Sequence, residues 1–130
     1  MTDPISDMLI RIKNAGTVQK KTASFGYSKI KWEIAKTLEK HKYLGEASKK
    51  GKKNKKLIEV TLFYDEDDKP KIANVKRISK LSRRIYLPYR QIHSVKNGYG
   101  IAVYSTTKGL LIDREARKEK LGGELLFEIW

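Results

Sequence analysis

The sequence predicts an α+β fold made of two small α/β-type halves: an N-terminal half with the order α-β-α-β-β and a C-terminal β-rich half with one short helix. Apolar residues recur at helical spacing in two stretches of the first half, whereas they alternate at strand spacing through most of the second. An acidic, turn-rich segment at residues 65–70 separates the two patterns. We therefore expect an N-terminal domain over residues 1–67 and a C-terminal domain over residues 68–130.

The first predicted helix begins at Asp3, whose carboxylate can accept hydrogen bonds from free backbone amides, and at Pro4, whose fixed φ suits a first turn. Its apolar stripe consists of residues at helical spacing: Ile5, Met8, Leu9 and Ile12. Residues 14–16 predict its end. Arg11 and Lys13 lie off the stripe, so we expect them to face outward.

A second helix follows a short strand at residues 25–27 and begins at Ser28, a favourable N-cap residue. Its apolar stripe recurs every four residues: Ile30, Ile34 and Leu38. The pair Leu44-Gly45 predicts the end of this helix. Trp32 lies off the stripe, and we interpret it as a packing residue against a neighbouring element rather than a platform for base stacking.

Six lysines stand among the eight residues from Lys49 to Lys56. Because so many like charges repel one another, we expect a mobile loop or a hairpin tip here. Lysines on such a loop would add general affinity for a polyanion without reading a sequence of bases. A strand from Leu57 to Tyr64 follows, since its apolar residues alternate from Ile58 onward.

The second half predicts a series of short strands: residues 72–78, 84–87, 101–104 and 110–112. Asp113 is expected to cap a short helix that runs through Ala116 and Arg117. The last strand alternates two sets of residues: Leu125, Phe127 and Ile129 with Glu124, Leu126 and Glu128.

The charge of the chain indicates a polyanionic partner. It has 29 Lys and Arg against 15 Asp and Glu, a formal net charge of +14 and a pI near 9.9. Both halves are basic, so nucleic acid is the first candidate partner, an anionic membrane surface the second and acidic proteins the third. No apolar run has the length that a bilayer requires, and we expect no membrane partner. The early acid at Asp3 does not fit a secretory signal, so we expect an intracellular protein.

Catalysis has little support in the sequence. The absence of cysteine excludes disulfides, thiolate metal sites and cysteine nucleophiles. His41 and His93 match no metal-ligand spacing. The acidic run at 65–68 precedes Lys69-Pro70, which is more typical of a solvated turn than of a divalent-ion site. We expect no catalytic residue, no metal and no cofactor.

The segment 105–109 is the main candidate site, because three hydroxyl residues precede a Lys-Gly turn at a strand end. Composition alone favours an ordinary turn here, since hydroxyls often stabilise turns. A second candidate is the pair Arg84 and Tyr86, which alternation places on one face, where a guanidinium and a ring can contact phosphate, ribose or base. An amphipathic strand with extended arginines explains the same pair equally well. Glu124 is either a solvent-facing strand residue or an acceptor beside that site.

Several of these stretches together resemble one protein family. They are STTKG, DREAR and GGELL near the C-terminus, DPISDMLIRIKNA at residues 3–15 and SKIKWEIAKTLEKHKYLGE at residues 28–46. In this order and spacing the sequence resembles ribosomal protein eight of the bacterial small subunit. The chain departs from the family at Leu81-Ser82, where the family usually has a Pro-Gly turn, and at Thr107, where it more often has Ser.

The resemblance implies a structural ribosomal protein that binds an irregular helix in the central domain of small-subunit ribosomal RNA early in assembly. Neighbouring small-subunit ribosomal proteins are the implied further partners, and the implied location is a cytoplasmic ribosome, with an organellar ribosome left open. The resemblance also implies a free monomer that represses translation of its own operon messenger RNA. The expected RNA-contacting residues are Ser105, Thr106, Thr107, Lys108, Gly109, Tyr86, Arg84, Glu124, Lys29, Lys31, Lys55 and Lys56.

The residues by themselves indicate a nucleic-acid-binding module. RNA is preferred over DNA because no recognition-helix pattern or heptad dimeriser is present. The alternatives are a DNA-binding regulator, a generic basic nucleic-acid-binding protein, and a nuclease or RNA-modifying enzyme that uses the acidic turn and a histidine.

Overall fold

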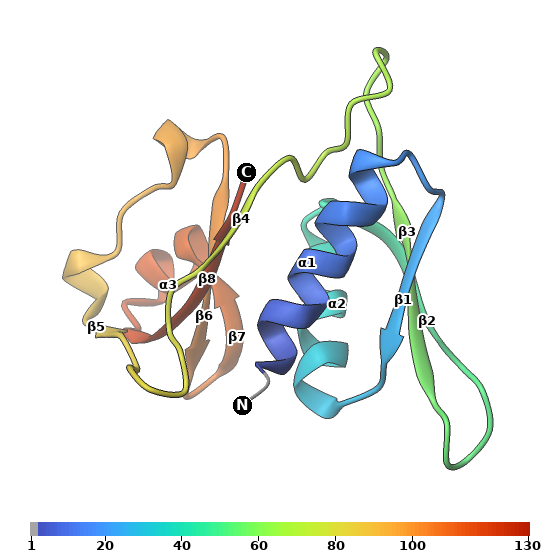
Figure 1. Cartoon of the computed structure of the whole chain (residues 1–130). Coiled ribbons are helices and arrows are strands. Elements are labelled where there is room, and N and C mark those ends of the chain that lie inside the picture. Colours follow the sequence, from blue (N-terminus) through green and yellow to red (C-terminus); the bar gives the residue numbers. More distant parts are fainter. Residues whose placement is uncertain (1–2) are drawn as a thin grey trace. The chain divides into compact units, whose positions relative to one another are not determined.

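The computed structural model describes residues 3–130, which divide into two compact units, an N-terminal unit ending at Ala73 and a C-terminal unit from Asn74 onward (Figure 1). The N-terminal unit has the order α-β-α-β-β, and the C-terminal unit is β-rich with one α-helix. The predicted α+β fold class is therefore confirmed. The acidic turn at residues 65–70 lies within the N-terminal unit, where Tyr64 and Pro70 form a β-bridge across it.

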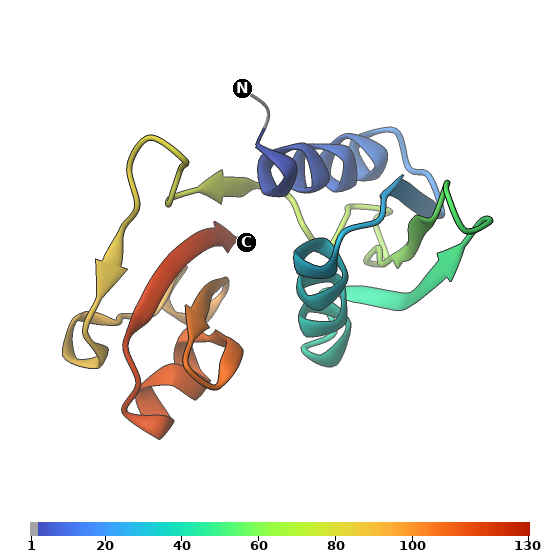
Figure 2. The same cartoon turned by 90° about the horizontal axis from the view of Figure 1, so that it is seen from below.

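The N-terminal unit is a sheet covered on one face by two helices (Figure 2). Its elements are α1 (Pro4–Thr17), β1 (Thr22–Gly26), α2 (Lys29–Lys40), β2 (Leu44–Lys50) and β3 (Leu57–Leu62). The strands pair antiparallel in the order β1-β3-β2. The apolar stripe of α1, the alternate residues of β3, and Ile34 and Leu38 of the α2 stripe are buried between the layers, whereas Ile30 is half-buried.

The predicted helix starts are confirmed by their caps. The Asp3 carboxylate accepts from the backbone amides of Ile5 and Ser6 at 3.1 and 3.3 Å. The Ser28 hydroxyl accepts from the Lys31 amide at 3.3 Å. Because these groups satisfy amides that have no partner within the helix, each cap fixes where its helix begins.

The predicted end of α2 at Leu44-Gly45 is wrong, because the helix ends at Lys40. Lys42 adopts a left-handed conformation with φ 62°, and the Tyr43 amide donates to the Leu38 carbonyl at 2.9 Å. This closing pattern ends a helix whether or not a glycine is present. Leu44 is consequently the first residue of β2.

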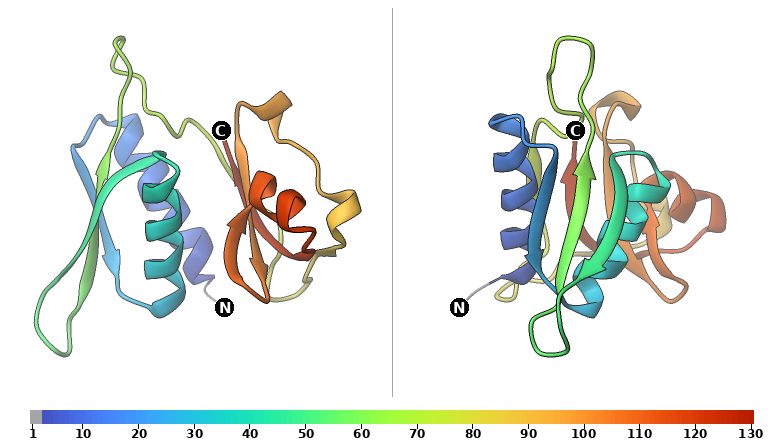
Figure 3. Two further views of the ribbon diagram at one scale, coloured as in Figure 1. Left: turned by 180° about the vertical axis from the view of Figure 1, so that it is seen from behind. Right: turned by 90° about the vertical axis from the view of Figure 1, so that its right-hand side faces the viewer.

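The lysine-rich run forms a hairpin, as predicted. Lys49 and Lys50 end β2, and residues 51–56 connect it to β3. Gly51 has φ 98°, and a Cβ there would lie 2.2 Å from the Lys55 carbonyl oxygen, so the turn requires glycine. Figure 3 shows this hairpin extending past the start of α2.

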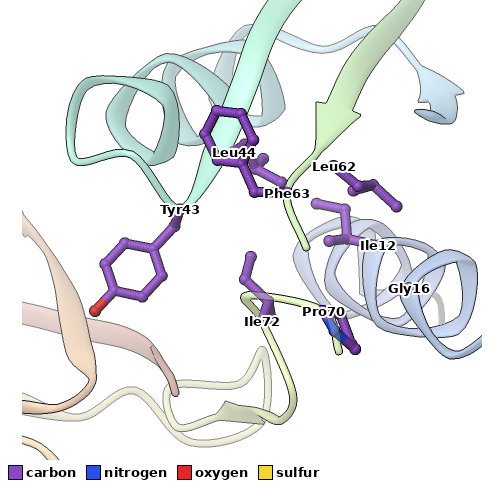
Figure 4. A pocket seen from close by; sticks show the side chains of 8 residues that line it. All are labelled: Ile12, Gly16, Tyr43, Leu44, Leu62, Phe63, Pro70 and Ile72. Atoms are coloured by element: carbon purple, nitrogen blue, oxygen red, sulfur yellow. The ribbon is translucent and has the colours of Figure 1, made fainter. Parts of the chain in front are cut away.

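A shallow pocket in the N-terminal unit is lined almost entirely by apolar groups. Its lining residues are Ile12, Gly16, Tyr43, Leu44, Leu62, Phe63, Pro70 and Ile72 (Figure 4). The Tyr43 hydroxyl points away from it (Figure 4). Because ligand sites combine apolar walls with converging polar groups, this pocket is a feature of packing rather than a binding site.

The C-terminal unit is built around its last strand. Its elements are β4 (Val75–Arg77), β5 (Tyr86–Leu87), the short 3₁₀ helices Tyr89–Gln91 and Lys96–Gly98, β6 (Ile101–Thr106), β7 (Gly109–Ile112), α3 (Asp113–Glu119) and β8 (Gly123–Ile129). The sheet order is β4-β8-β6-β7, and β5 also pairs with β8. Ala102 and Tyr104 of β6, Leu125 of β8 and Ala116 of α3 share one buried cluster.

Three expectations for this unit are wrong in detail. The strands predicted at 72–78 and 84–87 are shorter, while β6 continues to Thr106. Leu125, Leu126 and Phe127 are all buried, because the pairing of β6 with β8 shifts register and breaks the predicted alternation. Asp113 does not cap α3. Its buried carboxylate instead accepts from the Ala102 amide at 3.2 Å, while Glu115 accepts from the Ile112 amide at 3.0 Å.

Candidate nucleic-acid interface

The β6–β7 hairpin holds all five residues of the main candidate segment, and the hydroxyl of Thr106 organises its turn. This hydroxyl donates to the Gly109 carbonyl at 2.8 Å and accepts from the Lys108 amide at 3.1 Å. Gly109 has φ 95°, which favours glycine. Thr106 thus has the turn role that composition alone favoured. Thr107 is exposed and Ser105 half-buried at the end of the strand.

One row of residues crosses the sheet beside this hairpin. Tyr86 of β5 pairs with Glu124 of β8, and Glu124 pairs with Ser105 of β6. Directly paired residues of antiparallel strands project to the same face. The Tyr86–Glu124–Ser105 row therefore collects a phenol, a carboxylate and a hydroxyl from three strands. Tyr86 is 67% exposed, so its ring is open to a ligand.

Gly123 allows this close arrangement. A Cβ at Gly123 would lie 2.3 Å from the Ser105 carbonyl oxygen and 3.1 Å from Cγ2 of Thr106. No side chain fits in that space, so only glycine lets β8 approach the end of β6 this closely. Gly123, directly before Glu124, is thus a requirement of the sheet.

The Glu124 carboxylate is held in place by two donors. The Ser79 hydroxyl donates to Oε2 at 2.6 Å, and Nη1 of Arg84 donates to the same oxygen at 3.0 Å. Burial raises the pKa of Glu124, but the hydrogen bonds from Ser79 and Arg84 and the charge of Arg77 outweigh it and hold that pKa below its usual value. The carboxyl is consequently an anion at neutral pH.

Ser79 is a component of the site that the sequence did not indicate. It is fully buried, and its hydroxyl accepts from the Ile85 amide at 3.0 Å while it donates to Glu124. Ser79 therefore connects the segment leading into β5 with the carboxylate on β8. No spacing or motif signals a serine of this kind, because the carboxylate that it holds, Glu124, lies 45 residues further along the chain.

The Leu81-Ser82 pair forms the tip of a tight turn. The amides and carbonyls of Lys80 and Arg83 bond reciprocally across it at 2.9 and 3.0 Å. Neither tip residue has a positive φ, so the turn forms without glycine. Arg84, just after this turn, forms an ion pair with Glu124. Tyr86 is the strand partner of the same glutamate. The two residues expected to form an outward pair therefore both have Glu124 as a neighbour.

The chain matches one known family along almost its whole length. The family model described as "Ribosomal protein S8" matches residues 3–130. The chain belongs to the ribosomal protein S8 family. The resemblance inferred from the sequence is thereby confirmed, and this family consists of structural, non-enzymatic ribosomal proteins.

Similar S8 proteins align from end to end. The small ribosomal subunit protein uS8 of Syntrophus aciditrophicus is 43% identical over 131 residues, covering 100% of this chain and 98% of that protein. The protein of the same name in Persephonella marina is 43% identical over 135 residues, covering 100% of this chain and 99% of that protein. The one in Mesomycoplasma hyopneumoniae is 45% identical over 130 residues, covering 100% and 98%.

The remaining expected contacts of this S8 chain lie in the N-terminal unit. Lys29 begins α2 and is exposed, whereas Lys31 is half-buried in the same turn. Lys55 and Lys56 are exposed in the β2–β3 hairpin loop. In the C-terminal unit, Lys108 pairs with Glu119 at 3.2 Å, both of them largely exposed, so this pair adds little stability.

The acidic turn has a structural explanation. Oδ1 of Asp65 accepts from the amides of Asp67 and Lys69 at 2.8 and 2.9 Å, which closes the turn. Between Asp3 and Trp130, no cluster of three or more His, Asp or Glu could hold a metal ion. Over the same residues, no helix is both long and apolar enough to cross a membrane.

Proposed function

We propose that this S8-family chain is a structural protein of the small ribosomal subunit that binds an irregular helix in the central domain of small-subunit ribosomal RNA. The observation that carries the proposal is the Tyr86–Glu124–Ser105 row beside the β6–β7 hairpin. Its short polar groups reach base and ribose edges only where an RNA helix is distorted, because the major groove of regular A-form RNA is too narrow for side chains.

Glu124 fits this role despite its charge. Both of its hydrogen bonds end on Oε2, which leaves Oε1 as an acceptor for a base amino group. Arg84 beside it offsets the repulsion between the carboxylate and nearby phosphates. A carboxylate held in this way favours a base with an amino group over one without, so it adds selectivity rather than general affinity.

The relatives bear the name of small ribosomal subunit proteins, which supports a place in the ribosome beside other small-subunit proteins. Before assembly the chain would be a monomer in the cytoplasm. A messenger RNA of its own operon that carries a similar irregular helix would bind the same row, and its translation would then be repressed.

The test is a salt titration of binding to three ligands of equal length: the irregular central-domain helix, a regular RNA duplex and a DNA duplex. Wild type should prefer the irregular helix. The double variant Ser105→Ala/Thr106→Ala should lose this preference yet keep its salt slope, because hydroxyls contact bases and sugars without releasing counterions. Thr106→Ser is the matched control, since it keeps the turn-forming hydroxyl.

Equal affinity of wild type for the irregular helix and the regular RNA duplex would contradict the proposal. Equal or tighter binding of the DNA duplex would instead favour a DNA-binding regulator. If Ser105→Ala/Thr106→Ala lowered binding to all three ligands alike, the hairpin hydroxyls would stabilise the fold without selecting the irregular helix.

A further inference from the structure

Two aromatic rings and three lysines meet at one end of the N-terminal unit, where the helix-covered face of its sheet ends. Nζ of Lys49 lies 5.2 Å from the ring centre of Tyr27 and 4.7 Å from that of Trp32. Nζ of Lys56 lies 6.0 Å from the Tyr27 ring, and that of Lys36 lies 5.5 Å from the Trp32 ring. We call these five residues the aromatic–lysine cluster.

The backbone holds this cluster in place. Lys49 of β2 lies in one row with Ile58 of β3 and Phe25 of β1, both fully buried. The Tyr27 amide donates to the Lys56 carbonyl at 3.0 Å, which extends that pairing by one step. Lys49 lies on a paired strand, and the Tyr27–Lys56 hydrogen bond closes the base of the hairpin. The backbone therefore pre-organises these groups more than it does the lysines nearer the hairpin tip.

Trp32 is fixed as well. It lies in the first turn of α2, where its amide donates to the Ser28 carbonyl at 2.9 Å. The residue is half-buried, and lysine side chains lie over its ring. Tyr27 is 36% exposed, which leaves part of the cluster open to solvent.

The charge around the rings is unbalanced. Lys36 pairs with Glu39 at 2.9 Å, and Lys50 pairs with Glu59 at 2.7 Å. The ammonium groups of Lys49 and Lys56 instead lie over the Tyr27 ring, where the lysine-rich hairpin loop joins the sheet. Aromatic rings interleaved with cations are the arrangement by which proteins bind unpaired nucleic acid.

We propose that the aromatic–lysine cluster binds unpaired nucleotides of RNA, as a second site separate from the Tyr86–Glu124–Ser105 row. A base stacks on the ring of Trp32 or Tyr27 and displaces a flexible lysine side chain, whose ammonium group then pairs with the adjacent phosphate. The inference rests on the proposed function only in taking RNA as the ligand.

The test uses Trp32 as its own reporter. The chain has two tryptophans, so the full-length variant Trp130→Phe leaves Trp32 as the single source of tryptophan emission. Titration with a single-stranded hexa-adenylate should quench this emission to saturation. A hexaglutamate peptide and inorganic polyphosphate supply negative charge without a base, so they should produce no such quenching.

Side-chain variants in the Trp130→Phe background, read by fluorescence anisotropy of labelled hexa-adenylate, separate stacking from charge. Tyr27→Leu and Trp32→Leu should each weaken binding about tenfold, the usual loss for one stacked base. Lys49→Gln should weaken it more than Lys53→Gln, which removes the same charge from the hairpin tip. Circular dichroism of each variant checks that the fold persists.

Three outcomes would overturn the inference: quenching by hexaglutamate equal to that by hexa-adenylate, equal losses for Lys49→Gln and Lys53→Gln, or no loss in Trp32→Leu. The first would assign the cluster to an acidic protein partner. A chain that failed to prefer the irregular helix but still bound hexa-adenylate through Trp32 would refute the proposed function alone.

Discussion

At the scale of single residues, the candidate interface depends on the bonds that hold Glu124. Its carboxylate accepts from Ser79 and Arg84, and both donors come from the segment before β5. Fixing a side chain before a ligand arrives lowers the entropy that binding must remove. The site therefore consists of the Tyr86–Glu124–Ser105 row and of the buried Ser79, which holds Glu124 in place.

Ser79→Ala should destabilise the chain by about 1–3 kcal/mol, because it removes a fully buried hydroxyl that accepts from the Ile85 amide and donates to Glu124. It should also raise the pKa of Glu124, which loses a donor. Chemical denaturation and carboxyl NMR titration measure the two effects. Ser82→Ala, at the exposed tip of the neighbouring turn, is the matched control and should change neither. An unchanged pKa in Ser79→Ala would contradict the role given to Ser79.

Glu124 should also give stability a defined dependence on pH. Its folded pKa lies below the unfolded value of about 4.3, so the carboxylate stabilises the fold above that pH. This contribution is lost as the pH falls through the folded pKa. The difference in unfolding free energy between wild type and Glu124→Gln should thus shrink below about pH 4.3. A constant difference from pH 7 to pH 2 would show that the carboxylate gains nothing from its donors.

At the scale of elements, the close approach of β8 to β6 depends on Gly123. Gly123→Ala should cost about 1–3 kcal/mol, because its Cβ would lie 2.3 Å from the Ser105 carbonyl oxygen. It should also weaken binding to the irregular RNA helix by displacing Ser105 from the row. Denaturation and a binding assay measure these effects.

Gly26→Ala provides the control for this strand substitution, since a Cβ there meets only Lys31 Nζ, at 3.9 Å. It should leave the stability and the RNA preference nearly unchanged. If both substitutions destabilised the chain equally, general loss of glycine rather than the approach of β8 to β6 would explain the result.

The elements themselves followed from local signals wherever those signals were strong. Asp3 and Ser28 mark the starts of both long helices, because capping is decided within three residues. The end of α2 escaped prediction because Lys42 takes up a left-handed conformation normally assigned to glycine. Strand lengths in the second half also escaped prediction, since the lengths of β4 and β5 depend on which of their residues pair with β8.

At the scale of the whole molecule, positive charge is present in both units and should contribute to affinity from each. Changing Lys52, Lys53, Lys55 and Lys56 to Ala should flatten the salt dependence of RNA binding by up to about 0.7–0.9 in slope for each lost phosphate contact. The preference for the irregular helix should persist, because these lysines do not belong to the Tyr86–Glu124–Ser105 row.

The matched control removes the same number of positive charges from the other end of the N-terminal unit. It replaces Lys20, Lys21, Lys69 and Lys71 by Ala, all exposed. We expect this variant to keep a slope closer to that of wild type. Equal slopes for the two variants would mean that the hairpin acts through net charge alone.

The sequence by itself determined the fold class, the helix starts, the basic character and the family, because each depends on local periodicity, composition or the order of motifs. It also placed the hydroxyl segment, Tyr86 and Glu124 among the candidates. Only the tertiary structure decided that Tyr86, Glu124 and Ser105 stand in one row and that Ser79 supports it. The physical reason is that strand register and buried hydrogen bonds join residues far apart along the chain, and no local pattern encodes which of them will meet.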